Sequence, residues 1–314
     1  MRSILLVKTS SLGDVIHNLP VVSDLRRHWP ALAIDWVVEE SFAEIPRLHP
    51  GVRHVLPVAV RRWRKALTRR DTWHEIGQFQ RQLRETCYDL VIDTQGLVKS
   101  ALITRLADGL RCGYDRTVAR EPLAARFYDC HYAIPGTAHA VERNRWLVAA
   151  ACGYAPDLPL RYGIHANPDA GASPYCVLLT ATSRDDKLWP ETHWQALGQT
   201  LAAQGLRSLL PAGSPRERER ATRIASAIPG AETLPPSSLT ALAGILAGAQ
   251  SVVGVDTGLT HLAAALDRPV VALYVATDPG LTGVHAGPRA VNLGGRGQCP
   301  APAEVLNALQ ALPG

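Results

Sequence analysis

Two polar turns, each following a run of apolar residues, constrain the fold of this chain more than any other feature. The first is TATSRDDKLWP, Thr180–Pro190, and the second lies within VVGVDTGLTHLAAAL, Val252–Leu266. Each is typical of a buried strand that turns into a helix, the place where an open α/β sheet offers backbone N–H groups to a ligand. The pattern predicts a parallel sheet with a ligand site beside these turns.

Seven residues of these turns suit a diphosphate, because they supply hydroxyls, a compact cation and backbone that a ligand can approach closely. They are Thr182, Ser183, Lys187, Asp256, Thr257, Gly258 and His261. Capping of the following helices is the simpler alternative for Thr182 and Thr257. Capping alone requires neither the lysine nor the histidine, so we expect a diphosphate between the two turns.

The length and composition of the chain indicate a globular protein of two domains. A chain of 314 residues is long for one hydrophobic core. The first residues, MRSILLVKTSS, hold an apolar run too short for a signal peptide or a spanning helix, so we expect a first strand there. Six scattered cysteines without metal-like spacing indicate reduced, mostly buried thiols and a cytoplasmic protein.

Positive charge is concentrated in the first half of the chain. Residues 1–160 contain 22 Lys/Arg and 17 Asp/Glu, a net +5, whereas residues 161–314 contain 11 of each. Much of the excess lies in RRWRKALTRR, Arg61–Arg70, which indicates an anionic partner for this half. The only lysines among the 33 basic residues are Lys8, Lys65, Lys99 and Lys187. A compact ammonium is not interchangeable with a guanidinium in a tight site, so each lysine is a candidate binding residue.

Apolar runs alternate with helical patterns in both halves. In the first half we expect strands at Ser3–Lys8 and Ala33–Glu40, one helix through Pro20, and a loop over Gly113–Asp129. Residues 155–174 carry several prolines and glycines and are expected to be a linker. The alternation predicts an α/β protein of two Rossmann-like, doubly wound parallel-sheet domains, 1–160 and 161–314.

The turn after the first strand holds one carboxylate, Asp14, next to Gly13. A carboxylate in that place can accept a proton from a hydroxyl, and Asp93 at another strand end is the next candidate base. Two simpler roles for Asp14 stay open, a helix cap or an ion pair with Lys8. A nicotinamide enzyme is disfavoured, because this turn has one glycine and lacks G-x-G-x-x-G.

Seven segments spread over nearly the full chain form one larger pattern. They are KTSSLGDVIHNLP, DWVVEESFAEIP, RRWRK, DTQGLVKSALITRL, AREPLA, TSRDDKLWP and SVVGVDTGLTHLAAALDRPVVALYVATDPG. Together they resemble the bacterial lipopolysaccharide heptosyltransferases of the ADP-heptose glycosyltransferase family. The motif D-T-G-x-[ST]-H marks the wider family, while RRWRK with S-R-D-D-K-x-W-P favours its first heptosyltransferases over its second.

This resemblance implies a GT-B architecture, with two Rossmann-like domains facing a central cleft and the last helix returning to the N-terminal domain. It implies inverting transfer of L-glycero-D-manno-heptose from ADP-heptose to a Kdo residue of Kdo2-lipid A, without a metal and without a cofactor beyond this co-substrate. Because that acceptor is lipid-linked, the resemblance also implies peripheral association with the cytoplasmic face of the inner membrane.

The resemblance also implies roles for single residues. It gives the donor to the seven turn residues and to Glu217, for which a solvated acid in the RERER run is the simpler alternative. It makes Asp14 the general base. The implied acceptor-binding residues are Lys8, Ser11, Gly13, Arg61, Arg62, Arg64, Lys65, Gln95 and Arg120.

Two other functions remain open from the sequence. A second heptosyltransferase, or another sugar-nucleotide transferase of the same fold, would share the donor turns and differ in its acceptor. A nucleic-acid surface is the remote alternative, because arginines around Trp63 suit phosphates and stacked bases. That alternative leaves the turns of the second half without a role, so we expect no nucleic-acid partner.

Overall fold

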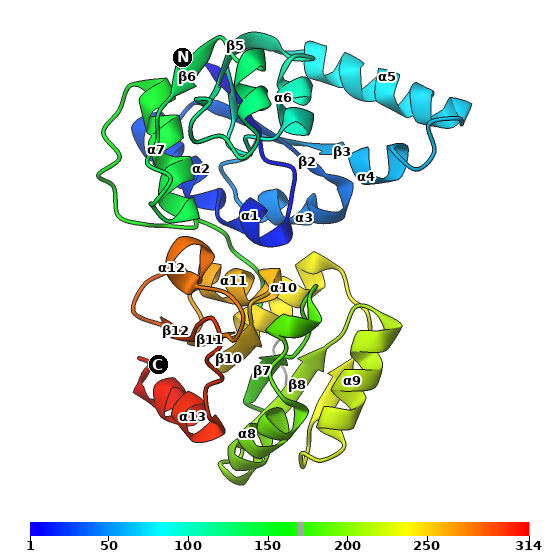
Figure 1. Ribbon diagram of the computed structural model, residues 1–314, viewed down its shortest axis with the longest axis vertical. Coiled ribbons are helices and arrows are strands. Elements are labelled where there is room, and N and C mark those ends of the chain that lie inside the picture. Colours follow the sequence, from blue (N-terminus) through cyan, green and yellow to red (C-terminus); the bar gives the residue numbers. More distant parts are fainter. Residues whose placement is uncertain (169–172, 314) are drawn as a thin grey trace. The chain divides into compact units, whose positions relative to one another are not determined.

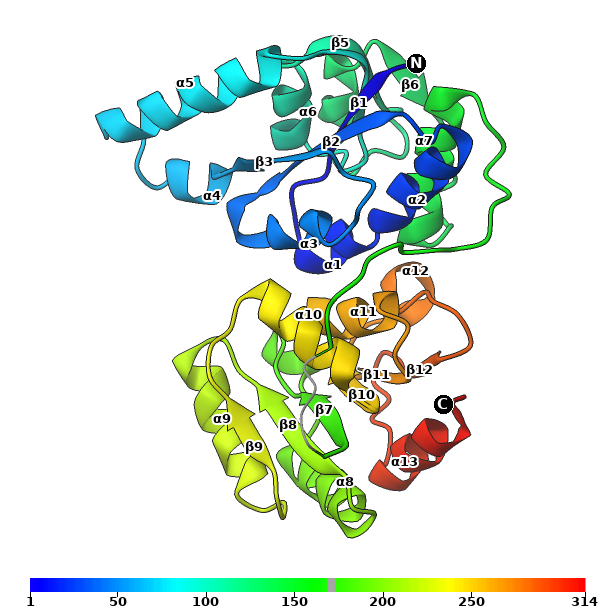
Figure 2. The same cartoon turned by 180° about the vertical axis from the view of Figure 1, so that it is seen from behind.

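A computed structural model describes residues 1–168 and 173–313 of the protein. The chain folds into two compact units, Met1–Ile164 and His165–Gly314. Each unit is built on one six-stranded parallel sheet, and Figures 1 and 2 show helices along both faces of each sheet. The predicted α/β class with two doubly wound parallel sheets is confirmed.

The first sheet has the strand order β3-β2-β1-β4-β5-β6. Its strands are β1 (Ser3–Val7), β2 (Ala33–Glu39), β3 (His54–Val58), β4 (Cys87–Asp93), β5 (Asp108–Tyr114) and β6 (Cys130–Tyr132). The direction of winding changes beside β1, where Val7 is level with Val37 of β2 and with Asp93 of β4. Open parallel sheets bind ligands at the carboxyl ends of the strands beside such a switch point.

The helices of the first unit differ from the prediction in two places. They are α1 (Leu12–Ile16), α2 (Leu19–His28), η1 (Glu40–Phe42), α3 (Glu44–Arg47), α4 (Val60–Trp63), α5 (Arg70–Arg84), α6 (Val98–Thr104), η2 (Pro122–Phe127) and α7 (Ala140–Cys152). The single helix expected through Pro20 is two helices, because proline lacks an N–H donor and stands in the first turn of α2. Residues 113–129, expected to be a loop, include the end of β5 and the 3-10 helix η2.

The second sheet has the order β12-β11-β10-β7-β8-β9. Its strands are β7 (Tyr175–Leu179), β8 (Arg207–Pro211), β9 (Glu232–Leu234), β10 (Ser251–Val255), β11 (Val270–Tyr274) and β12 (Ala290–Gly294). Its helices are η3 (Asp185–Lys187), α8 (Glu191–Ala203), α9 (Pro215–Ala225), α10 (Leu239–Gly248), α11 (Gly258–Ala265), α12 (Pro279–Thr282) and α13 (Pro302–Ala311). Helix α13, which the resemblance led us to expect at the N-terminal domain, packs against α8 and β11 of its own unit.

The central strands of both sheets are buried along their whole length, which explains their continuous apolar runs. All five residues of β1, β7, β10 and β11 are buried. Trp189 and Trp194 are fully buried and pack edge to face, with ring centroids 4.9 Å apart, in the core of the second unit. These rigid layers fix the strand ends that carry the polar turns.

Two further observations concern the whole of the described chain. Over residues 1–168 and 173–313, no helix has both the length and the apolar character needed to cross a bilayer. All six cysteines are free thiols. Only Cys112 and Cys176 are buried, while Cys87 and Cys299 are exposed, so the expectation of mostly buried thiols is wrong.

Candidate functional site

The two polar turns of the second unit lie beside each other, because β7 and β10 are neighbours in the sheet. Thr182 Oγ1 donates a 2.9 Å hydrogen bond to the carbonyl oxygen of Asp256, and Lys187 Nζ lies 2.7 Å from Asp256 Oδ2. A third strand end takes part, since Thr277 after β11 donates from Oγ1 to the same Oδ2 over 2.8 Å. Asp256 therefore joins three strand ends and holds Lys187 at the carboxyl edge of the sheet.

The first turn has the length that the sequence predicts, Thr180–Pro190. Strand β7 ends at Leu179 and α8 begins at Glu191, with the 3-10 helix η3 between them. Thr182 does not cap a helix, because its hydroxyl bonds across to the other turn. The side chains of Lys187 and Asp256 are only 17% and 15% exposed, so solvent screens this ion pair less than a surface pair.

The second turn leads straight into α11. Thr257 is the N-cap residue with an extended backbone, but its side chain makes no capping hydrogen bond. The helix starts at Gly258, and the N–H groups of such a first turn, together with the helix dipole, attract an anion. His261 lies one turn later and is 6% exposed, so its ring lies largely inside the unit.

A cavity of about 560 Å³ opens beside the first turn, and its lining includes Thr182 and Ser183 of that turn and Ser214 and Glu217 at the start of α9. Glu217 Oε2 accepts 2.9 Å hydrogen bonds from the backbone N–H groups of Gly213 and Ser214. Ser214 Oγ accepts in return from the N–H of Glu217, which completes a capping box at the start of α9. Glu217 is thus fixed in the cavity wall as a helix cap, and its side chain stays half-exposed.

In the first unit, Lys8 follows β1 and is buried with 4% exposure. Its Nζ donates to the carbonyl oxygen of Thr94 over 2.8 Å and to Asn144 Oδ1 over 3.3 Å. Burial lowers the pKa of Lys8 to about 8, although the nearby carboxylate of Asp14 opposes the shift. The ammonium therefore supplies a positive charge beneath the β1–α1 turn.

Asp14 lies in the first turn of α1 and serves as a cap. Its Oδ2 accepts from the N–H of Ser11 over 2.8 Å and from Ser11 Oγ over 3.1 Å. The direct ion pair is with Arg120, whose Nη2 is 2.7 Å from Oδ1, and Lys8 acts on Asp14 only through its charge. Burial raises the pKa of Asp14, but Lys8, Arg120 and the Ser11 hydrogen bond outweigh burial and hold the pKa below its usual range. The side chain keeps 15% exposure, so a ligand can reach it.

Gln95 and Asp93 support this turn from below. Gln95 is 2% exposed, and its Oε1 accepts from the N–H groups of Thr9 and Ser10 over 3.1 and 3.2 Å. Asp93 is fully buried and accepts from the Gln95 N–H over 2.7 Å and the Tyr128 hydroxyl over 2.7 Å. Burial raises the pKa of Asp93. Gln95 therefore positions backbone instead of facing a ligand, and Asp93 is too enclosed to serve as the next candidate base.

The basic stretch is divided between paired and unpaired charges. Arg62 lies 3.0 Å from Glu40 and 2.9 Å from Glu75, and Trp63 Nε1 donates to Glu75 over 2.7 Å. Arg64 and Lys65 are exposed and make no side-chain hydrogen bond or ion pair within residues 1–168 and 173–313. These two residues, rather than Arg62, present charge to an anion.

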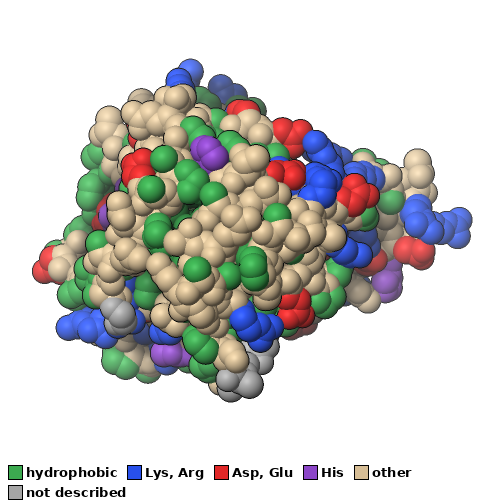
Figure 3. Space-filling model, turned by 90° about the horizontal axis from the view of Figure 1, so that it is seen from below, with side chains coloured by type: hydrophobic (Ala, Val, Ile, Leu, Met, Phe, Trp, Pro, Cys, Tyr) green, Lys and Arg blue, Asp and Glu red, His purple; other side chains and the backbone are tan. Residues whose placement is uncertain are grey.

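Trp63 and Arg61 also have partners on their own unit. The indole of Trp63 packs against Phe79 with ring centroids 5.9 Å apart. The guanidinium of Arg61 lies over the ring of Phe42, 5.3 Å from its centroid, and its backbone N–H donates to Glu39 Oε1. Trp63 is therefore partly held by its own unit, which weakens the case for a surface that stacks nucleic-acid bases. Figure 3 views the molecule from below, and on that face basic and acidic side chains lie close together.

Two residues outside the predicted set, Asn144 and Thr277, and the candidate lysine Lys99 take part in the contacts of these turns. Asn144 of α7 bonds Lys8, Thr277 bonds Asp256, and Lys99 Nζ donates to Ser10 Oγ over 3.1 Å. The rarity of lysine points to Lys99, whereas no local pattern points to Asn144. In the described ranges, no group of three or more His, Cys, Asp or Glu side chains is arranged to hold a metal ion.

Comparison with known proteins finds a matching family model and similar proteins. Residues 76–310 match glycosyltransferase family 9 (heptosyltransferase). The chain is 50% identical over 286 residues to lipopolysaccharide heptosyltransferase 1 of Escherichia coli strain K12, covering 89% of this chain and 90% of that protein. It is 32% identical over 315 residues to lipopolysaccharide heptosyltransferase 2 of Salmonella typhimurium strain LT2, covering 89% and 84%.

Solved structures give the same result for the fold. The E. coli heptosyltransferase WaaC with ADP superposes with a TM-score of 0.91 at 47% identity, covering 98% of both chains. The same enzyme with ADP-2-deoxy-2-fluoro heptose gives a TM-score of 0.88 at 46% identity, again covering 98% of both. The similarity therefore extends over both units of the chain.

Proposed function

The chain belongs to glycosyltransferase family 9, it transfers heptose from ADP-heptose in lipopolysaccharide core biosynthesis, and we propose that its acceptor is the Kdo residue of Kdo2-lipid A. The junction of Lys187, Asp256 and Thr182 at the carboxyl edge of the second sheet carries the donor assignment. The higher identity to the heptosyltransferase 1 relative than to the heptosyltransferase 2 relative supports the first-heptose acceptor.

The donor diphosphate binds to the second unit in this proposal. Lys187 and the N–H groups at the start of α11 supply positive charge where the leaving ADP becomes more negative. Asp256 keeps Lys187 pointed at that edge, and Thr182 fixes the spacing of the two turns. Glu217 and Ser183 line the adjoining cavity, which suits the nucleoside.

The acceptor binds to the first unit, where Asp14 is the general base. The acceptor hydroxyl oxygen forms a bond to the anomeric carbon of heptose while the bond from that carbon to the ADP oxygen breaks. The hydroxyl proton passes to Asp14, and the bonding electrons leave with ADP. Attack from the side opposite ADP inverts the anomeric centre.

The low pKa of Asp14 sets the timing of that proton transfer. A carboxylate stabilised by Lys8 and Arg120 is a weak base toward a neutral alcohol. The alcohol becomes acidic once its oxygen has begun to bond to the positively charged anomeric carbon. Proton transfer to Asp14 is therefore late, and Arg120 remains near the carboxylate to bind a negative group of the acceptor.

We also propose where in the cell the reaction takes place and that it needs no metal or further cofactor. The lipid-linked acceptor places the enzyme at the cytoplasmic face of the inner membrane as a peripheral protein, with Arg64 and Lys65 toward the anionic groups of the acceptor. Positive charge from Lys187 and α11 takes the role that a metal has in other transferases, so neither a metal nor a further cofactor is required.

The direct test is to incubate the protein with ADP-heptose and Kdo2-lipid A in EDTA, and to measure ADP release and the mass of the lipid product. We expect ADP release and the gain of one heptose. The matched control replaces the acceptor by its heptosylated product. Transfer to that control and not to Kdo2-lipid A would contradict the acceptor assignment, and dependence on added metal would contradict the metal-free chemistry.

A further inference from the structure

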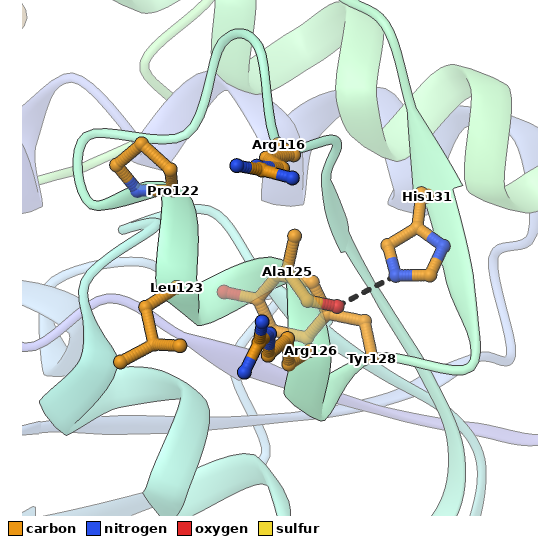
Figure 4. A pocket seen from close by; sticks show the side chains of 7 residues that line it. All are labelled: Arg116, Pro122, Leu123, Ala125, Arg126, Tyr128 and His131. Carbon is orange, nitrogen blue, oxygen red and sulfur yellow. Dashed lines mark hydrogen bonds between the residues drawn. The ribbon is translucent and has the colours of Figure 1, made fainter.

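A cavity of about 760 Å³ lies in the first unit and is lined by residues that have no role in the proposed transfer chemistry. Figure 4 shows its lining, which comes from the turn after β5, from the 3-10 helix η2 and from β6. The lining residues are Arg116, Pro122, Leu123, Ala125, Arg126, Tyr128 and His131. We refer to it as the η2 cavity.

The η2 cavity contains two uncompensated positive charges. Arg116 and Arg126 are exposed, and neither guanidinium makes a hydrogen bond or ion pair within residues 1–168 and 173–313. Their neighbours differ, because Arg111 pairs with Asp129 at 2.7 Å and Arg120 pairs with Asp14 at 2.7 Å. Two unpaired guanidiniums on one cavity suit a phosphate, which accepts several hydrogen bonds from such planar donors.

The wall of the cavity is rigidly built. The Tyr128 ring is buried, and its hydroxyl is held by Asp93. A Cβ at Gly113 would stand 2.3 Å from that ring, so glycine is needed there for the tyrosine to occupy its place. His131 Nε2 donates to the carbonyl oxygen of Ala125 over 2.6 Å, the contact drawn in Figure 4. The cavity is therefore a fixed feature of the fold.

Exposed leucines occur on η2 and on the helix that packs against it. Leu123 of η2 is 50% exposed, and Leu102 of the neighbouring helix α6 is 49% exposed. Helices α6 and η2 pack on each other through Ala101 and Ala124. Binding of a soluble anion does not require exposed leucines. At a membrane surface, lipid phosphate groups lie next to acyl chains, so arginines and exposed leucines can both make contacts there.

We propose that the η2 cavity binds the phosphate of an anionic bilayer phospholipid, and that Leu123 and Leu102 enter the acyl boundary beside it. Arg116 and Arg126 bind the phosphate oxygens. The inference rests on the proposed function in one respect, since it names the membrane partner of an enzyme whose acceptor is a lipid. In this proposal the ligand of the η2 cavity is a lipid of the bilayer and not the acceptor.

The position of the cavity fits this role. The turn that carries Arg116 also carries Arg120, whose guanidinium contacts Asp14. The N–H of Glu121 donates to the carbonyl oxygen of Gly96 over 3.0 Å, which ties the same turn to the strand end that holds Gln95. A phospholipid held at Arg116 therefore brings the bilayer next to the half-site for a lipid-linked acceptor.

The test measures binding of the full chain to vesicles that contain no acceptor. Sedimentation with phosphatidylcholine vesicles, with and without phosphatidylglycerol, is compared for wild type, for Arg116→Ser/Arg126→Ser and for Arg27→Ser/Arg47→Ser. The control pair loses the same charge from exposed residues whose side chains make no hydrogen bond or ion pair in the described chain. We expect binding that requires phosphatidylglycerol, a loss of about tenfold or more in the cavity variant and little loss in the control. Equal losses in the two variants would overturn the proposal.

A second pair of variants tests the apolar part. Leu123→Ser removes a side chain that is 50% exposed, and Leu281→Ser removes one that is 49% exposed in the other unit. We expect weaker vesicle binding from the first variant alone, with unchanged melting temperatures in both. No weakening in the first variant would contradict the inserted leucine.

A third measurement, the KM for a soluble acceptor, distinguishes the bilayer from the acceptor as the source of the phosphate. With a deacylated, phosphorylated acceptor, the variant Arg116→Ser/Arg126→Ser is expected to keep the wild-type KM. A raised KM together with unchanged vesicle binding would show that the cavity holds a phosphate of the acceptor, and would overturn the proposal. Absence of any heptosyl transfer would count against the proposed function alone, because vesicle binding is measured without turnover.

Discussion

The two units of this protein differ in which charged group a ligand can reach. In the second unit, Lys187 and Asp256 meet directly at the edge of the sheet, and the cation stands close to the surface. In the first unit, the cation Lys8 is buried, and the carboxylate of Asp14 is the group that a ligand can reach. A diphosphate is negative throughout the reaction and needs a fixed cation, whereas a hydroxyl must lose a proton and needs a base. This difference agrees with the proposed function, in which each unit binds one of the two substrates.

The largest effect is expected from Asp14→Asn, which tests the base in the first unit. The amide keeps the shape and most of the capping contact with Ser11 but cannot take the proton. We expect turnover to fall by at least about a hundredfold, measured as ADP release. Asp115→Asn is the matched control, because Asp115 also accepts backbone N–H bonds in a turn of this unit. Near-normal turnover in Asp14→Asn would make Asp14 a cap only.

The next effect is expected from Lys187→Ala, which tests the cation in the second unit. Its loss leaves the growing charge on the leaving diphosphate uncompensated, so we expect kcat/KM for ADP-heptose to fall about a hundredfold. Arg184→Ala removes a cation from the same turn, and that arginine pairs with Asp186 at the surface. Equal losses in the two variants would show that net charge, and not the position of Lys187, matters.

A smaller effect is expected on the KM for the acceptor, and it should differ between the unpaired and the paired side chains of the basic stretch. We expect Arg64→Ser/Lys65→Ser to raise the KM for the acceptor by about tenfold, because each loses one charged contact. Arg62→Ser should raise it far less, since Glu40 and Glu75 already hold that guanidinium. Steady-state kinetics at two salt concentrations measure both. A larger effect from Arg62 would reverse the assignment of these residues.

The smallest effect is expected on the free energy of unfolding at high pH. The folded pKa of Lys8, about 8, lies below the value of 10.5 for an exposed lysine. The unfolded chain therefore binds more protons between these pH values, so the free energy of unfolding should rise with pH across that window. Lys8→Met should remove a rise on the order of 1 to 3 kcal/mol, measured by urea unfolding at pH 7.5 and 10. The same slope in wild type and variant would mean that Lys8 is not desolvated.

The donor side was the more predictable half of the site, because its residues lie in two short turns. Lys187 and Thr182 share one turn, Asp256 begins the next, and neighbouring parallel strands bring such turns together. The contact between Thr182 and the carbonyl of Asp256 is not predictable from the sequence, because a threonine in a turn can equally well cap a helix.

The acceptor side was less predictable, because its contacts join distant residues. Asn144 reaches Lys8 from α7, and the pairing of Arg62 with Glu75 depends on how α5 lies against α4. Strands β6 and β9 have three residues each, too few for a periodic pattern to reveal. The burial of Gln95 was also not predictable. The sequence places this residue at a strand end, whereas in the structure its side chain lies beneath the β1–α1 turn and bonds the backbone there.

Calorimetric titration of ADP into Asp14→Asn and Lys187→Ala tests the division of labour between the two units most directly. We expect Asp14→Asn to bind ADP with wild-type affinity while its turnover is lost. We expect Lys187→Ala to bind ADP at least about tenfold more weakly, since one contact with a charged group is lost. Weakened ADP binding in Asp14→Asn, with full affinity in Lys187→Ala, would contradict the assignment of the donor to the second unit and of the base to the first.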